Sequence, residues 1–132
     1  MTTGLIERRH PLLGAMLRIW RACPDAQLTL PGSLAPLTVQ LLYRDGDWRV
    51  GEVGAAIDAL YGRSLTNVAL CDLAADREDL ASAAEVAWNS GQPLLLESAL
   101  ATSTSVRRVA RLYLPVRGAE ERSVLCGMVA CD

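Results

Sequence analysis

Thiols and imidazoles have the greatest intrinsic reactivity among the side chains of this sequence, and they are few. The cysteines are Cys23, Cys71, Cys126 and Cys131, and the one histidine is His10. A cysteine beside a histidine can act as a nucleophile, and a C-x-x-C pair can bind metal or cycle to a disulfide. No C-x-x-C pair occurs, and no cysteine has metal-like spacing to the histidine. Buried, reduced thiols are the expectation, and a small thiol-dependent enzyme using Cys71 or Cys126 is the alternative.

Acidic residues form a second reactive pattern, because Asp76, Glu78 and Asp79 could act as paired carboxylates. The same residues open an expected helix, where Asp76 is a good N-cap and the other two favour the positive end of the helix dipole. The sequence has no G-x-S-x-G elbow, and Gly51 and Gly54 precede no G-K-[ST]. We therefore predict no catalytic residues, no metal ligands and no enzymatic activity.

Two amphipathic helices are predicted from apolar residues that recur with the helical period. The first spans residues 11–23, begins at Pro11 and ends before Pro24. Its apolar stripe consists of Leu12, Leu13, Met16, Leu17 and Trp20. The second spans residues 76–90 and ends at Gly91. Its buried face is expected to contain Leu80, Ala83, Ala84, Ala87 and Trp88.

Extended runs surround the second helix. Two of them, residues 40–44 and 47–53, flank an Asp45-Gly46 turn, although a short helix over residues 36–42 competes with the first run. A helix of one or two turns follows at residues 55–61 and ends at Gly62, and residues 63–75 are expected to be irregular or short helical turns.

Three further extended runs complete the chain, at residues 94–101, 106–116 and 123–131. Short connectors favour antiparallel pairing, and hence an α+β fold with helices on one face of a five-stranded sheet. Along residues 106–116 the residue types alternate between two faces. One face carries Ala110, Leu112, Leu114 and Val116, and the other carries Arg107, Val109, Arg111 and Tyr113.

The order of these elements resembles the PAS-domain family, and most closely the small single-domain PAS-like proteins of alphaproteobacteria. The matching segments cover nearly the whole chain, and their joint order carries the resemblance. They are Leu17-Arg18-Ile19-Trp20, Leu30-Pro31, Pro36-Leu37, Val53-Gly54-Ala55-Ala56-Ile57, Gly62-Arg63-Ser64-Leu65 and Arg111-Leu112-Tyr113-Leu114-Pro115. The resemblance implies a sensor fold whose N-terminal helix, within residues 1–33, precedes a PAS-like sensor domain at residues 34–132, together forming one structural unit.

The resemblance also raises the question of a cofactor. Flavin photosensors of this family carry a reactive cysteine after the short helix, whereas this chain has Arg63-Ser64-Leu65-Thr66-Asn67-Val68 there. Haem-binding members usually use a histidine on the long helix, and residues 76–90 contain none. Haem and photochemical flavin are therefore not expected, and the cofactor, if the family's cavity holds one, stays unknown.

Candidate site residues fall into two groups. The residues expected to line a small apolar ligand cavity are Trp48, Tyr61, Trp88, Leu112, Leu114 and Met128. The residues expected at a protein interface are the helical stripe Leu13, Leu17 and Trp20 and the outward sheet face Arg107, Arg111 and Tyr113. The alternative for the interface group is mutual packing, with the N-terminal helix covering that sheet face within one chain.

Composition sets the remaining limits. The chain has 132 residues, 51% of them hydrophobic, which favours one domain with a real core. Its net charge of −2 predicts no nucleic-acid partner, and no apolar run is long enough to span a membrane. We predict a cytoplasmic sensory or signalling module that forms a homodimer and contacts an unknown signalling protein. A ligand-free structural dimerisation module is a further alternative.

Overall fold

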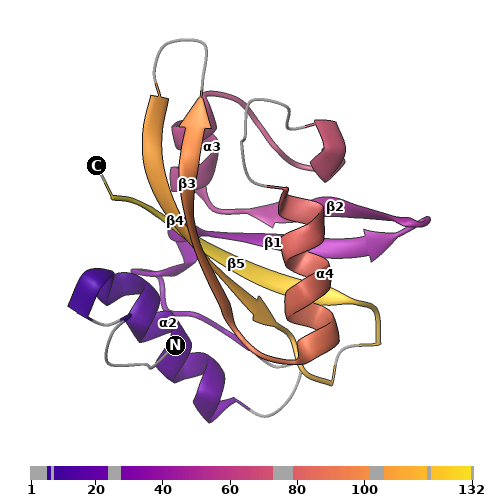
Figure 1. The fold of residues 1–132 in the computed structure, drawn as a ribbon, viewed down its shortest axis with the longest axis horizontal. Coiled ribbons are helices and arrows are strands. Elements are labelled where there is room, and N and C mark those ends of the chain that lie inside the picture. The colour runs from indigo at the N-terminus through magenta and orange to yellow at the C-terminus, as the bar shows by residue number, and fades with distance from the viewer. Residues whose placement is uncertain are drawn as a thin grey trace.

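The computed structural model describes residues 6, 8–23, 28–72, 79–101, 106–118 and 120–131. Figure 1 shows a central sheet with helices on both sides. The elements are helix α2 (Pro11–Ala22), 3-10 turn η1 (Ala35–Leu37), strands β1 (Thr38–Arg44) and β2 (Asp47–Val53), helix α3 (Ala55–Tyr61), 3-10 turn η2 (Leu70–Asp72), helix α4 (Leu80–Ser90) and strands β3 (Leu94–Ala101), β4 (Val106–Pro115) and β5 (Ser123–Ala130).

The sheet has five strands in the order β2-β1-β5-β4-β3, and all neighbouring pairs are antiparallel. Asp45 and Gly46 form the β1–β2 turn, and both have positive φ, at 55° and 79°. Two such residues suit the twist of a tight hairpin. The predicted α+β class and this turn are confirmed. Among the described residues, no helix has the length and apolar character needed to cross a bilayer.

Two separate hydrophobic cores lie on the two faces of the sheet. On one face, α3 and α4 pack over side chains such as Leu41, Tyr113 and Cys126. On the other face, the apolar stripe of α2 packs over Leu112 and Leu114. Alternate residues of β4 therefore belong to opposite cores, as the period of two in a strand requires.

Two predicted element boundaries are wrong. The helix expected over residues 36–42 is limited to η1, because Thr38 already pairs with Gly127 of β5 as the first residue of β1. Helix α4 begins at Leu80 and not at residue 76, because Asp79 is the N-cap and accepts a 3.0 Å hydrogen bond from the Ser82 N–H. The predicted cap Asp76 and its neighbour Glu78 lie outside the described residues.

A close backbone contact fixes the start of α3. Gly54 donates its N–H to the Thr38 carbonyl oxygen at 2.7 Å. A Cβ placed on Gly54 would lie 2.7 Å from the Ala35 carbonyl oxygen and closer still to the Pro36 carbonyl group. These are backbone atoms, so they cannot rotate away as a flexible side chain would.

We predict that Gly54→Ala lowers the free energy of unfolding by about 2 kcal/mol, because overpacking forces the backbone to shift. Urea unfolding followed by circular dichroism measures this change. Gly32→Ala is the matched control, because a Cβ at Gly32 meets nothing within 4 Å. Equal stability of the two variants would contradict the contact.

Candidate functional site

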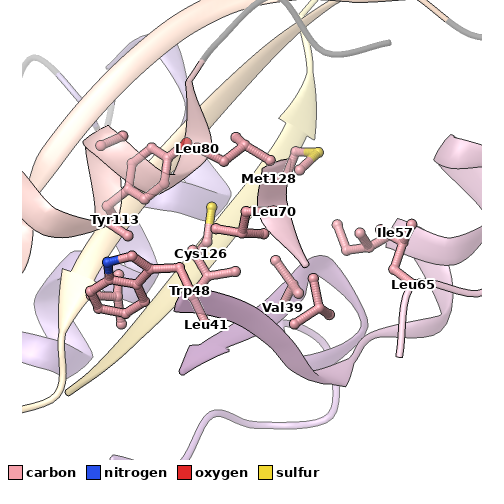
Figure 2. Close-up of a cluster of buried hydrophobic side chains, with 14 of the residues drawn as sticks. Val39, Leu41, Trp48, Ile57, Leu65, Leu70, Leu80, Tyr113, Cys126 and Met128 are labelled. Atoms are coloured by element: carbon pink, nitrogen blue, oxygen red, sulfur yellow. The ribbon is translucent and has the colours of Figure 1, made fainter. Parts of the chain in front are cut away.

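The face of the sheet beneath α3 and α4 holds a small internal cavity. Its volume is about 10 Å³. That is the room one water needs. Figure 2 shows how the surrounding side chains converge from the sheet and the helices. The lining residues are Val39, Leu41, Val50, Ile57, Tyr61, Leu65, Leu70, Leu80, Arg111, Cys126 and Met128.

Arg111 gives the wall of this otherwise apolar cavity a positive charge. Its side chain lies on β4 and is 0% exposed. The guanidinium Nη1 donates to the Ser98 hydroxyl of β3 at 2.9 Å, and Nη2 donates to the Tyr61 hydroxyl of α3 at 3.0 Å. An arginine keeps its charge in a protein, so these bonds place a cation between the sheet and the end of α3.

The predicted cavity residues are divided between the two faces of the sheet. Tyr61 and Met128 line the cavity. Trp48 is buried in the same core, where its Nε1 donates to the Glu85 carboxylate at 2.7 Å, and Trp88 packs half-buried against that core. Their assignment to the cavity wall stays a prediction.

Leu112 and Leu114 do not face the cavity, so the prediction for these two residues is wrong. They lie on the opposite face of β4, in the core beneath α2. Both strand faces are apolar, and alternation alone therefore did not identify which face points to which helix.

The predicted interface stripe is buried within its own chain. Leu13, Leu17 and Trp20 are 0%, 1% and 5% exposed and belong to the core that contains Leu112 and Leu114. The stripe thus packs within its own chain, but not on the sheet face that the alternative named. The sheet face it covers is the opposite one to that of Arg111.

The outward sheet surface expected from Arg107, Arg111 and Tyr113 is not present. Arg107 is exposed, but Arg111 and Tyr113 are both 0% exposed. The reason is that α4 packs over this face of β4. Arg111 and Tyr113 consequently cannot meet a partner in this conformation.

Arg117, which the sequence analysis overlooked, holds the C-terminal end of α2. Its guanidinium lies over the Trp20 ring at 4.0 Å from the ring centre and donates to the Trp20 and Cys23 carbonyl oxygens at 2.6 and 2.7 Å. A cation at a helix C-terminus satisfies carbonyls that have no partner in the helix. The Trp20 Nε1 donates to the Pro115 carbonyl oxygen at 2.7 Å.

Glu97 holds the N-terminal end of α2. His10 is 6% exposed, and its Nε2 lies 3.2 Å from Glu97 Oε1. Arg9 and Arg108 also contact this carboxylate, at 3.1 and 3.5 Å. The hydrogen bond with His10, followed by the charges of Arg9 and His10, lowers the pKa of Glu97 from its ordinary value of 4.5. The His10 side chain makes no cap hydrogen bond to α2.

Cys126, one of the two thiols weighed as a nucleophile, is enclosed in the core. Cys126 is 1% exposed in the core beneath α4, and a nucleophile must be reachable by substrate. The side chain of Cys71 lies outside what the structure describes. Within the described part of the chain, no group of three His, Cys, Asp or Glu residues is arranged to hold a metal ion.

Comparisons with known proteins identify the fold. No family model matches the chain, and no curated protein matches it. A fungal LOV domain photoreceptor superposes with a TM-score of 0.62 at 13% identity over 90% of each chain. The light-state dimer of the fungal blue-light photoreceptor Vivid gives 0.60 at 12% identity, over 87% of this chain and 91% of that one. The PAS domain of an HTR-like protein from Haloarcula marismortui gives 0.53 at 13% identity, over 94% and 98%.

These likenesses confirm the PAS-like fold that the sequence predicted. Helix α2 precedes the five-stranded sheet, and the shorter helices and α4 share one face, as expected. Identities this low show the fold alone. The narrower resemblance to single-domain alphaproteobacterial proteins stays a prediction.

We predict that Glu97 stabilises the fold in a pH-dependent way. Because its pKa is lowered on folding, the contribution is present above pH 4.5 and is lost as the pH falls through the lower folded value. The difference in unfolding free energy between wild type and Glu97→Gln should therefore shrink under acidic conditions. Urea unfolding at a series of pH values measures this difference.

The control for this experiment is Glu52→Gln, which removes an exposed carboxylate of β2. Its unfolding free energy should follow that of wild type at each pH. A difference between wild type and Glu97→Gln that stays constant from neutral to acidic pH would contradict the role of Glu97.

Proposed function

We propose that the chain is a non-enzymatic sensory or signalling module of PAS-like fold that acts through protein contacts. The observation that carries this proposal is the sharing of β4 and β5 by two cores. Their residues pack alternately against the cavity and against α2. A structural change in the cavity is therefore separated from α2 only by the thickness of the sheet.

The neighbouring residues Gly127 and Met128 of β5 illustrate this coupling. Met128 lines the cavity, whereas a Cβ on Gly127 would meet the Met16 sulfur and would lie 3.2 Å from Leu13 Cδ2 of α2. A shift of β5 in response to the cavity would thus reach α2 directly. Such a shift transmits a signal only if a ligand or partner binds the two arrangements with different affinity.

Flavin, which the family resemblance implies for light-sensing members, does not fit these residues. The cavity has room for about one water, and the segment 63–68 after α3 supplies no cysteine thiol. His10 lies on the α2 side of the sheet beside Glu97, away from the cavity, so the residues do not fit haem ligation by that histidine.

A second candidate function, a ligand-free dimerisation module, is favoured by the same cavity volume of about 10 Å³. In both cases the output is a protein contact. A cytoplasmic location and an unidentified signalling partner stay predictions.

We predict that substitution in the cavity wall on β5 loosens α2 more than substitution in the wall on α3. Met128→Ala and Ile57→Ala both remove a side chain that is at most 2% exposed, and each should cost about 2–5 kcal/mol. Hydrogen–deuterium exchange should show faster amide exchange in α2 for Met128→Ala than for Ile57→Ala. The reason is that Met128 lies on β5 next to Gly127, which contacts Met16 and Leu13 of α2. Equal exchange in α2, after correction for global stability, would contradict the coupling.

We also propose that the module forms a homodimer, a state that the structure of Vivid in its light state also has. Because the apolar stripe of α2 is covered, the dimer must use other surface or must follow release of α2. Native mass spectrometry and light scattering across the micromolar range should show the dimer mass. A monomer at every concentration in that range would contradict the proposed homodimer. It would not bear on the proposed coupling between β5 and α2.

A further inference from the structure

The two edge strands of the sheet, β2 and β3, differ in what covers them. The segment after α3 pairs with the outer edge of β2: the Val50 N–H donates to the Val68 carbonyl oxygen at 2.9 Å, and the Asn67 N–H donates to the Val50 carbonyl oxygen at 3.0 Å. Among the described residues, only β4 pairs with β3, so no described strand covers the outer edge of β3. An uncovered edge is a template for pairing with another chain.

The register of the sheet identifies the backbone groups at this edge. Cys131 donates its N–H to the Arg108 carbonyl oxygen at 2.9 Å, so Arg108 directs its backbone groups toward β5. Because these directions alternate along an antiparallel strand, Val109 directs its groups toward β3, where it lies opposite Ser98. The residues of β3 that alternate with Ser98 in the other sense direct their N–H and C=O groups to the outer edge. They are Leu95, Glu97, Ala99 and Ala101.

Strand β3 lacks most of the features that protect an uncovered edge. Proteins discourage pairing at such an edge with lysine, proline, several charges or a β-bulge. The eight residues of β3 read LLLESALA, in which Glu97 is the one charge. All eight pair with β4 without a shift in register. The strand is therefore regular, mostly apolar and suited to accept a further strand.

A second copy of β3 matches this edge when the two strands run antiparallel. A two-fold axis between the Ser98 residues of the two copies sets Leu95 opposite Ala101 of the second copy, and Glu97 opposite Ala99 of the second copy. All the outward-directed residues then form hydrogen-bonded pairs. An axis at Glu97 would instead place two carboxylates directly opposite one another, which is destabilising.

The same register brings opposite charges together on the face of the sheet that α2 covers. Within one chain, Arg108 lies opposite Ala99, and its Nη2 is 3.5 Å from Glu97 Oε2. Glu97 of the second copy lies on the other side of Ala99, two strand spacings or about 10 Å from the backbone of Arg108. Ala99 is small, and the arginine and glutamate side chains are together long enough to meet above it. Each copy thus supplies a cation to the carboxylate of the other.

We propose that β3 pairs with β3 of a second copy through this edge, antiparallel and centred on Ser98, so that the two five-stranded sheets become one continuous sheet. The inference rests on the homodimer of the proposed function and names its surface. The apolar stripe of α2 stays on its own sheet, and the dimer forms without release of α2.

Charge substitutions at Ala99 test the register. Ala99→Glu sets a carboxylate opposite Glu97 of the second copy, twice in each dimer, and should raise the dimer dissociation constant roughly tenfold. Ala99→Lys should lower it, because the ammonium group faces that carboxylate. Sedimentation equilibrium at low salt measures both constants. Val86→Glu and Val86→Lys, at a position of α4 that is 54% exposed, are the matched controls and should leave the constant unchanged.

Loss of the fold would not imitate these results. The new glutamate of Ala99→Glu lies opposite Arg108 of its own chain, whereas the lysine of Ala99→Lys lies there against a like charge. The stability of the single chain should therefore change in the sense opposite to that of the dimer. Urea unfolding at a concentration below the dissociation constant measures this stability.

Amide exchange resolved by residue tests the edge directly. Dilution below the dissociation constant should speed the exchange of the outward N–H groups of Leu95, Glu97 and Ala99. Ser98 and Leu100, which bond to β4, should keep their rates and serve as controls within the same strand. Exchange followed by nuclear magnetic resonance at two protein concentrations measures the difference.

Three outcomes would overturn the inference. A dimer whose dissociation constant is the same in both Ala99 variants would use another surface, and the proposed homodimer would stand. Slow exchange of the outward amides in a monomer would mean that another segment of the chain covers this edge. A wild type that is monomeric with fast exchange at this edge would contradict the homodimer as well. The coupling between β5 and α2 is separate from all three, because amide exchange in α2 of Met128→Ala measures it.

Discussion

The whole structure depends on the burial of both faces of β4 and β5. From Val109 to Pro115 every residue of β4 is buried, and β5 is nearly as enclosed. Antiparallel sheets commonly leave one face to solvent, whereas these central strands have α4 on one side and α2 on the other. This enclosure leaves no exposed position between Val109 and Pro115, whereas Arg107 and Arg108 at the start of β4 are exposed. Arg111 is the one arginine in the described part of the chain that is fully buried.

The attachment of α2 comes mainly from its apolar stripe. Leu13, Met16, Leu17 and Trp20 are each at most 5% exposed, and burial of such a side chain contributes about 1.5–3 kcal/mol. The polar contacts at the two ends contribute less, because a hydrogen bond has a net value of about 1 kcal/mol and partly exposed ion pairs have less. The stripe therefore holds α2 on the sheet. Glu97 and Arg117 set where along the sheet it lies.

Local patterns in the sequence predicted most of the elements and, through their order, the fold. The Asp45-Gly46 turn, the left-handed Gly62 and Gly91 and the alternation in residues 106–116 all depend on neighbouring residues, and all are present. The face of β4 that lines the cavity could not be predicted in this way. Alternation defines two faces, but both are apolar, and only the packing of α2 and α4 shows which is which.

The contacts that locate the ends of α2 were also beyond sequence reasoning. His10 and Glu97 are 87 residues apart, and Trp20 and Arg117 are 97 apart. A lone histidine beside a proline gives no sign of a distant carboxylate. Arg117 lies in a connector that indicated only a turn. Long-range polar pairs of this kind become visible when the register of β3, β4 and β5 is known.

The two sides of the sheet are in close packing contact through β5. Protein interiors are packed as densely as organic crystals, so a displaced strand must displace its neighbours. Gly127 of β5 has no room for a Cβ because Met16 and Leu13 of α2 occupy that space, and Cys126 and Met128 on either side of it pack against the opposite core. A movement of β5 toward α2 has no void to absorb it. The contact of Gly127 with Met16 and Leu13 is therefore the route through which the proposed coupling between the cavity and α2 would act.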